Sequence, residues 1–221
     1  ADGFTPSPET IALAEHPSVR LYVNERNVGP YVSAMGTWSH HVSDWYAVSD
    51  ADDLDSPGRF WDAVTVLREY EADLFGAAMD QFVDPGHERS EAEVGRVPYH
   101  RSGSVWGCAP YGTCVHTTCV FRRSSFEALN GYRSLFCAGD VEINTRGRFA
   151  GWRIVISPAL HGHRRLRDDS LSRGGEWQVG KPKRLELEAT LAADYALWSE
   201  RGCDAAAYGG LPDVLADPGV C

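Results

Sequence analysis

The sequence predicts an α/β fold in which an open, mainly parallel sheet is covered by helices on both faces. Two observations support this prediction: helix start signals alternate with short apolar segments through the first half of the chain, and these segments lack polar alternation. Alternating helices and strands favour a parallel sheet, and uninterrupted apolar strands are typical of a sheet that is covered on both faces. The length of 221 residues fits one domain, so we expect residues 1–221 to fold as a single unit.

The first half of the chain supplies three helices and three strands. Ser7 followed by Pro8 predicts a helix that continues to His16, because the hydroxyl caps free amides and proline is tolerated at the first helical position. Ser56 and Pro57 repeat this signal. We expect the remaining elements of this half at residues 19–23, 45–48 and 74–78 for the strands and at 32–42 for a helix.

The second half begins with residues 84–112, which are rich in glycine, proline, serine and charge and predict an irregular insertion loop. Such loops often hold binding residues. Beyond it we expect strands at 114–121 and 152–156, with Ser157-Pro158 ending the second, and helices at 124–129 and 140–149. A late helix has one apolar stripe, formed by Leu187, Leu191, Tyr195 and Trp198.

Composition narrows the classes of function. The formal net charge of −10 disfavours nucleic acid as a partner, because a polyanion is repelled. No apolar run approaches the ~20 residues of a membrane-spanning helix. The start at Ala1 lacks a secretion signal, so we expect a cytoplasmic protein, in solution or at the inner face of the membrane. Nearly all positive charge is arginine, which suits phosphate ligands. The six cysteines lack metal-binding spacing, and we expect buried thiols.

Three carboxylates, Asp50, Asp52 and Asp53, directly follow the apolar segment 45–48. Ligands of open α/β sheets bind beyond the carboxyl ends of the strands. Hard cations such as Mg²⁺ or Mn²⁺ prefer oxygen ligands and leave room for substrate phosphates. The pattern therefore predicts a site for a cation and a nucleotide, with a solvated acidic loop as the alternative. An EF-hand loop is excluded, because its fifth and sixth positions are not filled by the residues it needs.

Four stretches of the sequence, in this order, resemble motifs of glycosyltransferase family 2. They are Ala1-Asp2-Gly3-Phe4-Thr5, similar to D-D-G-S-T; Asn24-Glu25-Arg26-Asn27-Val28-Gly29, similar to N-x-x-N-x-G; Ser49-Asp50-Ala51-Asp52-Asp53, similar to the acidic metal motif; and Phe121 through Asn130-Gly131 to Gly139-Asp140, similar to the acceptor-side segment that ends in the catalytic acidic residue. Members of this family share the GT-A fold and generally transfer a sugar with inversion. The resemblance covers roughly residues 1–172 and implies that fold and that activity.

The resemblance implies roles for individual residues. They are contact with the nucleotide for Asp2, Asn27 and Asp50, and binding of Mn²⁺ or Mg²⁺ for Asp52 and Asp53. The donor would be a nucleotide-diphosphate sugar, which we expect to be UDP-linked. Asp140 would be the general base that takes the proton of the acceptor, a saccharide or another hydroxyl compound. Without the resemblance, an interaction of Asp140 with the dipole of a helix N-terminus would be the favoured interpretation.

The sequence departs from the family pattern in three places. It starts after the point where the family has its first strand, so we expect Ala1 to be an internal residue of a longer protein. Ala34 stands in place of a basic residue of the diphosphate clamp. Arg167 stands in place of a histidine that completes metal binding; His161 and His163 lie near enough to replace it, and we predict His163 as the ligand.

Arg164 and Arg165 are expected to pair with the donor diphosphate, because guanidinium groups match phosphate oxygens. A hydrated loop of histidines and arginines is the alternative. Among the tryptophans, Trp106 in the insertion is our candidate for stacking on a sugar or base, while Trp152 and Trp177 are expected in the core. Two other functions stay open: a sugar nucleotidyltransferase, and a truncated or degenerate module that binds sugar or nucleotide without activity.

Overall fold

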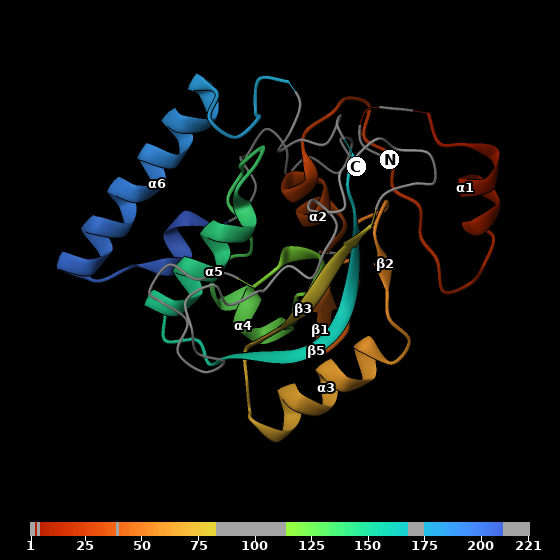
Figure 1. The fold of residues 1–221 in the computed structure, drawn as a ribbon, viewed down its shortest axis with the longest axis horizontal. Coiled ribbons are helices and arrows are strands. Elements are labelled where there is room, and N and C mark those ends of the chain that lie inside the picture. Colours follow the sequence, from red (N-terminus) through yellow and green to blue (C-terminus); the bar gives the residue numbers. More distant parts are fainter. Residues whose placement is uncertain (1–2, 4, 39, 83–113, 168–174, 210–221) are drawn as a thin grey trace.

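The computed structural model describes residues 3, 5–38, 40–82, 114–167 and 175–209 of the chain. Within these ranges the chain has an α/β fold, as the sequence predicts (Figure 1). The helices are α1 (Pro8–Leu13), α2 (Pro30–Trp38), α3 (Arg59–Glu69), α4 (Arg123–Ala128), α5 (Gly139–Phe149) and α6 (Pro182–Arg201). The strands are β1 (Trp45–Ala47), β2 (Leu54–Asp55), β3 (Leu74–Phe82), β4 (Val120–Arg122) and β5 (Ile154–Arg165), and two 3₁₀ turns are η2 (His116–Thr118) and η3 (Ala205–Tyr208).

The sheet is open and mixed, with the strand order β1-β4-β3-β5-β2. Its longest pairing is parallel and joins β3 to β5 over the whole length of β3. The pairings of β1 with β4, β4 with β3 and β5 with β2 are antiparallel and cover two or three residue pairs each. Parallel pairing is therefore confined to the centre of the sheet and the strands at its edges are antiparallel, a detail that the apolar pattern does not indicate.

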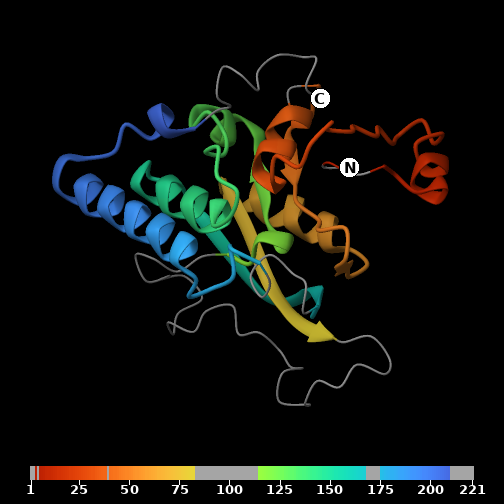
Figure 2. The same cartoon turned by 90° about the horizontal axis from the view of Figure 1, so that it is seen from above.

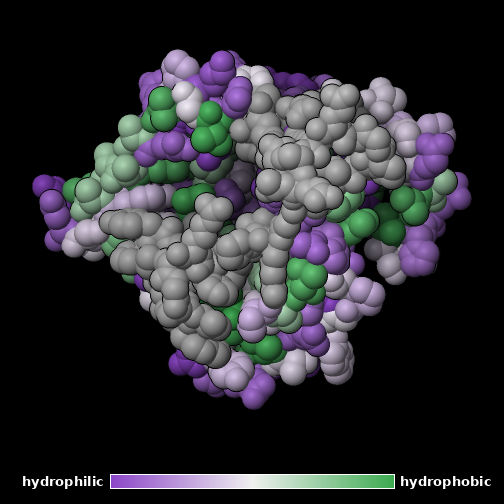
Figure 3. All heavy atoms as spheres, viewed as in Figure 1, coloured by the Kyte–Doolittle hydropathy of each residue, from purple (hydrophilic) through white to green (hydrophobic). Residues whose placement is uncertain are grey.

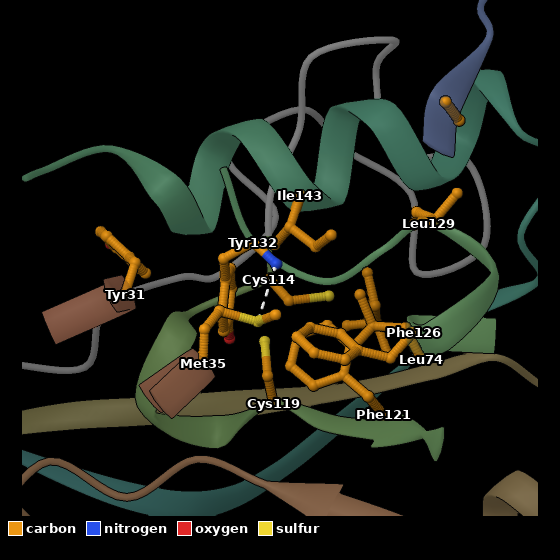
Figure 4. Packing of buried hydrophobic residues seen from close by; sticks show 12 residues of the cluster. Tyr31, Met35, Leu74, Cys114, Cys119, Phe121, Phe126, Leu129, Tyr132 and Ile143 are labelled. Carbon is orange, nitrogen blue, oxygen red and sulfur yellow. Dashed lines mark hydrogen bonds between the residues drawn. The ribbon is translucent and has the colours of Figure 1, made fainter. Parts of the chain in front are cut away.

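Helices cover both faces of the sheet (Figure 1). On one face, α3 packs Ala63 and Leu67 into a cluster with Phe75 of β3 and Val120 of β4. The opposite face holds a larger cluster below α5, toward which Ile143 points (Figure 4). This cluster includes Tyr31, Met35, Leu74, Cys119, Phe121, Phe126, Leu129 and Tyr132. Helix α5 is thereby held against the sheet with its first residues near α2.

Helix α6 lies beside α5 in both views (Figures 1 and 2). Leu191, Tyr195 and Trp198 of the predicted apolar stripe are buried, and Leu187 is half-buried. These side chains pack with Ala138, the residue just before α5. The stripe is confirmed, and it supports the start of α5.

A buried arginine joins the chain segments on both sides of α5. The side chains of Arg146 and Glu142 are fully buried and form an ion pair, with Nε 2.7 Å from Oε1. The same guanidinium donates to the carbonyl oxygens of Leu129, Gly131 and Ala205 at 2.5, 2.6 and 2.9 Å. Because a buried ion pair is tolerated when its other hydrogen bonds are also made, this network ties the turn after α4 to η3.

The N-terminal helix begins where the sequence predicts, because Ser7 Oγ accepts a hydrogen bond from the Thr10 amide at 3.2 Å. It ends at Leu13 rather than His16 and buries none of its residues. Ile11 and Leu13 are exposed, and Figure 3 shows apolar surface at this end of the molecule, on the right. Helix α1 thus lies away from the sheet.

Three predicted strands differ in the structure. Residues 19–23 form no strand, since β-type residues need a neighbouring strand to pair with. The segment 114–121 is a strand only in β4, preceded by the turn η2. Strand β5 continues through Pro158, where it was expected to end. Pro158 lies at an irregularity in the pairing with β3, where no ladder hydrogen bond is needed.

Some predictions concern residues outside the described part of the chain: Asp2, Trp106 and the insertion at 84–112. None of the helices that the structure describes is both long and apolar enough to cross a membrane. The described cysteines agree with the prediction of free thiols: Cys114, Cys119 and Cys137 are buried and Cys203 is half-buried.

Candidate functional site

The acidic turn, residues 50–53, connects β1 to β2 where β3 and β5 reach their carboxyl ends. On one side, the amide of Asp50 donates to Thr117 Oγ1 of η2 at 3.4 Å. On the other side, Asp53 Oδ1 accepts from the backbone amide of Arg165 at 2.9 Å. The turn therefore lies at the edge of the sheet where the sequence predicts ligand binding.

Asp50 is an exposed residue, but neighbouring protein atoms remove part of the hydration of its carboxyl group. Its pKa is raised, first by this loss of hydration and then by the negative charges of Asp52 and Asp140, while His116 and Arg164 oppose the shift. The same interactions show that Asp140, 90 positions later in the chain, lies within electrostatic reach of Asp50.

Asp53 shares this negative potential. Burial raises its pKa, as do the charges of Asp50 and Asp52, although the amide of Arg165 and the charge of Arg164 act in the opposite direction. The negative charges that neighbour Asp50 and Asp53 make a region where a bound cation would be stabilised. This negative potential comes from the side chains of the acidic turn and of Asp140.

Arginine side chains border the acidic turn. Arg167 Nη1 lies 3.3 Å from Asp52 Oδ2, and both side chains are partly exposed. The charge of Arg164 acts on Asp50. Arg165 reaches the turn through its backbone amide, whereas its guanidinium lies over the ring of Phe82. Arg164 is thus placed to meet an anion at the turn, and Arg167 already partners Asp52.

Asp140 is the second residue of α5, after Ala138 at a φ of 60° and Gly139. Tyr31 Oη donates a hydrogen bond to Asp140 Oδ1 at 3.0 Å. The carbonyl oxygen of Asp140 accepts from Asn144 Nδ2 at 2.8 Å. The carboxylate is therefore at a helix N-terminus, as the alternative interpretation predicts, and its charge also acts on Asp50 of the acidic turn.

The two histidines of β5 are both engaged by protein groups. His163 Nδ1 lies 2.6 Å from Asp80 Oδ1, and its Nε2 lies 3.2 Å from Ser56 Oγ. His161 Nε2 lies 3.3 Å from Asp62 Oδ2 of α3, and burial lowers its pKa. His163 can bind a cation only after one of its contacts breaks. Within the described ranges, no group of three or more His, Cys, Asp or Glu side chains is arranged to hold a metal ion.

The N-x-x-N-x-G segment forms the turn that leads into α2. Asn27 is exposed, and its Oδ1 accepts from the amide of Gly29 at 3.0 Å, at a φ of 87° for the glycine. Asn24 is buried and donates from Nδ2 to Ser33 Oγ at 2.8 Å. Its carbonyl oxygen accepts from the amide of Gly3 at 3.2 Å. Gly3 of the first motif therefore lies beside Asn24 of the second.

Three residues of this region were missed by the sequence analysis. Tyr31 and His116 interact with the carboxylates described above, and Arg59 is fully buried, with hydrogen bonds to Asp55 and to the carbonyl oxygen of Val48. Nothing in the local pattern distinguishes Tyr31 or His116. The i,i+4 spacing of Asp55 and Arg59 at a helix start was the one signal available for the third residue.

Comparison with known proteins identifies the family and the fold of the chain. The model of the family "Glycosyl transferase family 2" matches residues 2–129. Crystal structures of S. aureus TarS are similar in fold. TarS 1–349 with UDP-GlcNAc has a TM-score of 0.63 at 14% identity, covering 90% of this chain and 55% of that one. TarS 1–349 with UDP has a TM-score of 0.56 at 15% identity, covering 76% of this chain and 50% of that one.

A longer TarS structure gives a TM-score of 0.58 at 12% identity, covering 91% of this chain and 34% of the TarS chain. This chain thus spans about half or less of the TarS chains that it matches. No curated protein matches the sequence. The fold is the GT-A fold of these structures, and the family model covers more than half of the chain. The chain belongs to glycosyltransferase family 2.

Proposed function

We propose that this protein transfers a sugar from a UDP-linked donor to a hydroxyl group of an acceptor, with inversion at the sugar carbon and with help from a divalent cation. Family membership supports the transferase activity over a sugar nucleotidyltransferase. The UDP and UDP-GlcNAc bound to TarS support a UDP-linked donor. The observation that supports the mechanism most is the electrostatic interaction between Asp140 and Asp50 of the acidic turn.

The acidic turn suits a divalent cation that is shared with a substrate. Mg²⁺ and Mn²⁺ are often held by one or two carboxylates, with substrate phosphates supplying further oxygens. Asp52, and Asp53 beside it, would provide such oxygens. The pKa values of Asp50 and Asp53 are raised first by burial and then by neighbouring negative charge, which a cation would offset. His163 is a further ligand in this proposal only if it leaves Asp80 or Ser56. When bound, the cation would neutralise charge on the departing diphosphate.

The nucleotide would bind between the acidic turn and the turn before α2. Asp50 and Asn27 would supply oxygens for hydrogen bonds with ribose or base, and so would Asp2, which precedes Gly3 in the sequence. Arg164, whose charge reaches Asp50, would pair with the diphosphate, and Arg165 would join it only by leaving the ring of Phe82. The acceptor would approach from the side of α5.

Asp140 would act as the general base. Its carboxylate takes the proton of the acceptor hydroxyl while the hydroxyl oxygen forms a bond to the anomeric carbon of the sugar. The bond from that carbon to the diphosphate oxygen breaks, and its electron pair leaves with UDP. Attack from the face opposite to UDP inverts the configuration. The products are the glycosylated acceptor, UDP and one proton.

Calorimetric titration with UDP tests the nucleotide and cation site. We expect Mn²⁺ to raise the affinity of the unmodified protein for UDP at least about tenfold, and Asp52→Asn to abolish this increase. Asp44→Asn is the matched control, because Asp44 is exposed and precedes β1. Equal affinities with and without Mn²⁺ would remove the cation from the proposal. Release of UDP from UDP-GlcNAc then separates a transferase from an inert binding module.

A further inference from the structure

The carboxylate of Asp140 accepts a hydrogen bond from Tyr31, which lies at the start of α2. Tyr31 Oη donates to Asp140 Oδ1 at 3.0 Å. In the part of the chain that the structure describes, Oδ1 accepts this hydrogen bond, and no side-chain hydrogen bond or ion pair involves Oδ2. One oxygen is thus anchored, while the other is available to a proton donor such as an acceptor hydroxyl.

Tyr31 itself is fixed by its surroundings. Its side chain is 6% exposed, and its ring lies 5.3 Å from the ring of His116 and 5.2 Å from that of Tyr132. Figure 4 shows Tyr31 at one edge of the buried cluster, where α2 meets the start of α5. The tyrosine therefore has little freedom to turn its hydroxyl away from Asp140.

Gly139 leaves room for the ring of Tyr31, because it has no side chain. A Cβ atom at position 139 would lie 2.6 Å from Cγ of Tyr31, which is closer than atoms can approach. The ring thus occupies the space that any side chain at this position would take. Burial and the charge of Asp140 raise the pKa of Tyr31, so the hydroxyl keeps its proton at neutral pH and acts as a donor.

The backbone of Asp140 is held from a second direction. Asn144 is fully buried, donates from Nδ2 to the carbonyl oxygen of Asp140 at 2.8 Å, and accepts from the amide of Cys114 at 3.2 Å. Main chain and carboxylate are thus anchored by different neighbours. Among the described residues, Tyr31 makes the side-chain hydrogen bond that orients the carboxylate group.

We propose that Tyr31 is a positioning residue, which orients Asp140 for proton transfer and links the start of α2, beside the nucleotide turn, to the catalytic base. This inference rests on the proposed function of Asp140 as base. Tyr31 does not touch the reacting atoms; it acts through Asp140.

The test compares Tyr31→Phe with the unmodified full chain in the release of UDP from UDP-GlcNAc, with water as acceptor. We expect kcat to fall about tenfold or more, because misplacing a catalytic group by about 1 Å can cost up to ~10²-fold. KM for UDP-GlcNAc, the affinity for UDP and the melting temperature should stay near their original values. Tyr132→Phe is the matched control, since it removes a neighbouring buried hydroxyl that bonds His116 rather than Asp140.

A double variant separates this inference from the proposed function. In the Asp140→Asn background, Tyr31→Phe should cause no further loss, because its effect passes through Asp140. If the unmodified protein releases no UDP, or Asp140→Asn is fully active, the proposed function fails and the inference with it. If Asp140→Asn is inactive while Tyr31→Phe is unimpaired, only the positioning role is wrong. Equal losses in Tyr31→Phe and Tyr132→Phe, or a Tyr31→Phe loss confined to KM, would also overturn it.

Discussion

Arg167 Nη1 lies 3.3 Å from Asp52 Oδ2, so the arginine that replaces a family histidine contacts the very carboxylate proposed to bind the cation. A guanidinium and a divalent ion compete for the same oxygen. The pair is partly exposed, and exposed ion pairs are weak. We therefore expect the arginine to weaken the binding of a cation at Asp52 without preventing it.

Replacing Arg167 should strengthen cation binding in the absence of nucleotide. We expect Arg167→Ala to lower the dissociation constant for Mn²⁺ by about three- to tenfold, because Asp52 loses a competing positive charge. Titration of Mn²⁺ into the two proteins measures this change. Arg201→Ala is the control, because Arg201 is exposed in the last turn of α6. A weaker Mn²⁺ affinity after loss of Arg167 would contradict the competition.

The raised pKa of Asp50 predicts a cost to stability at neutral pH. Since its pKa is higher in the folded than in the unfolded protein, the folded state is favoured when the group is protonated, and this advantage disappears as pH rises through the folded pKa. Asp50→Asn should therefore raise the melting temperature at pH 7 without Mn²⁺. The difference should shrink as pH is lowered toward the unfolded value. Thermal unfolding at several pH values measures it, and a lower melting temperature at pH 7 would contradict the prediction.

Arg146 should be among the most costly residues to remove. Arg146→Ala leaves Glu142 charged in a fully buried place and leaves the carbonyl oxygens of Leu129, Gly131 and Ala205 without their donor. We expect a loss of about 3–5 kcal/mol in the free energy of unfolding. Urea denaturation measures this loss.

The matched comparison for Arg146 is an exposed ion pair. Glu127 contacts Arg123 at 2.7 Å with 44% of its side chain exposed, so Glu127→Ala should cost less than about 1 kcal/mol. Similar losses in both variants would mean that the buried network adds no special stability.

A side chain at position 139 should displace Tyr31. We expect Gly139→Ala to lower kcat for UDP release about tenfold while UDP still binds, because the new Cβ would overlap the tyrosine ring. Kinetics and UDP titration of the variant measure both effects. Combined with Tyr31→Phe, the losses should not add, since both act on the same contact. Additive losses would assign separate roles to the two residues.

The fold class was predictable because it depends on local patterns. Alternating helix signals and apolar segments placed α1, α2, β1, α3, β3, α4 and α5 near their observed positions. The antiparallel edges of the sheet were not predictable, because strand direction depends on which segments meet in space. For the same reason, residues 19–23 have strand composition but form no strand.

Some residues of the candidate site were likewise predictable from the sequence, and others were not. Motif order pointed to the acidic turn and Asp140, which the structure brings within electrostatic reach of each other. The motifs did not indicate Tyr31, because its role depends on a contact with Asp140, 109 positions away in the sequence. Nor could they tell that both nitrogens of His163 are engaged by Asp80 and Ser56.

By itself, the sequence determined the identity of the chemical groups: a run of carboxylates behind an apolar strand, arginines near them, and an aspartate at a helix start. Only the tertiary structure decided which groups touch. In the structure, Arg167 contacts Asp52 and Tyr31 donates a hydrogen bond to Asp140. Arg146 donates to a carbonyl oxygen in the turn after α4. The physical reason is that composition and spacing act over one or two turns of chain, whereas these contacts arise from packing helices onto a shared sheet.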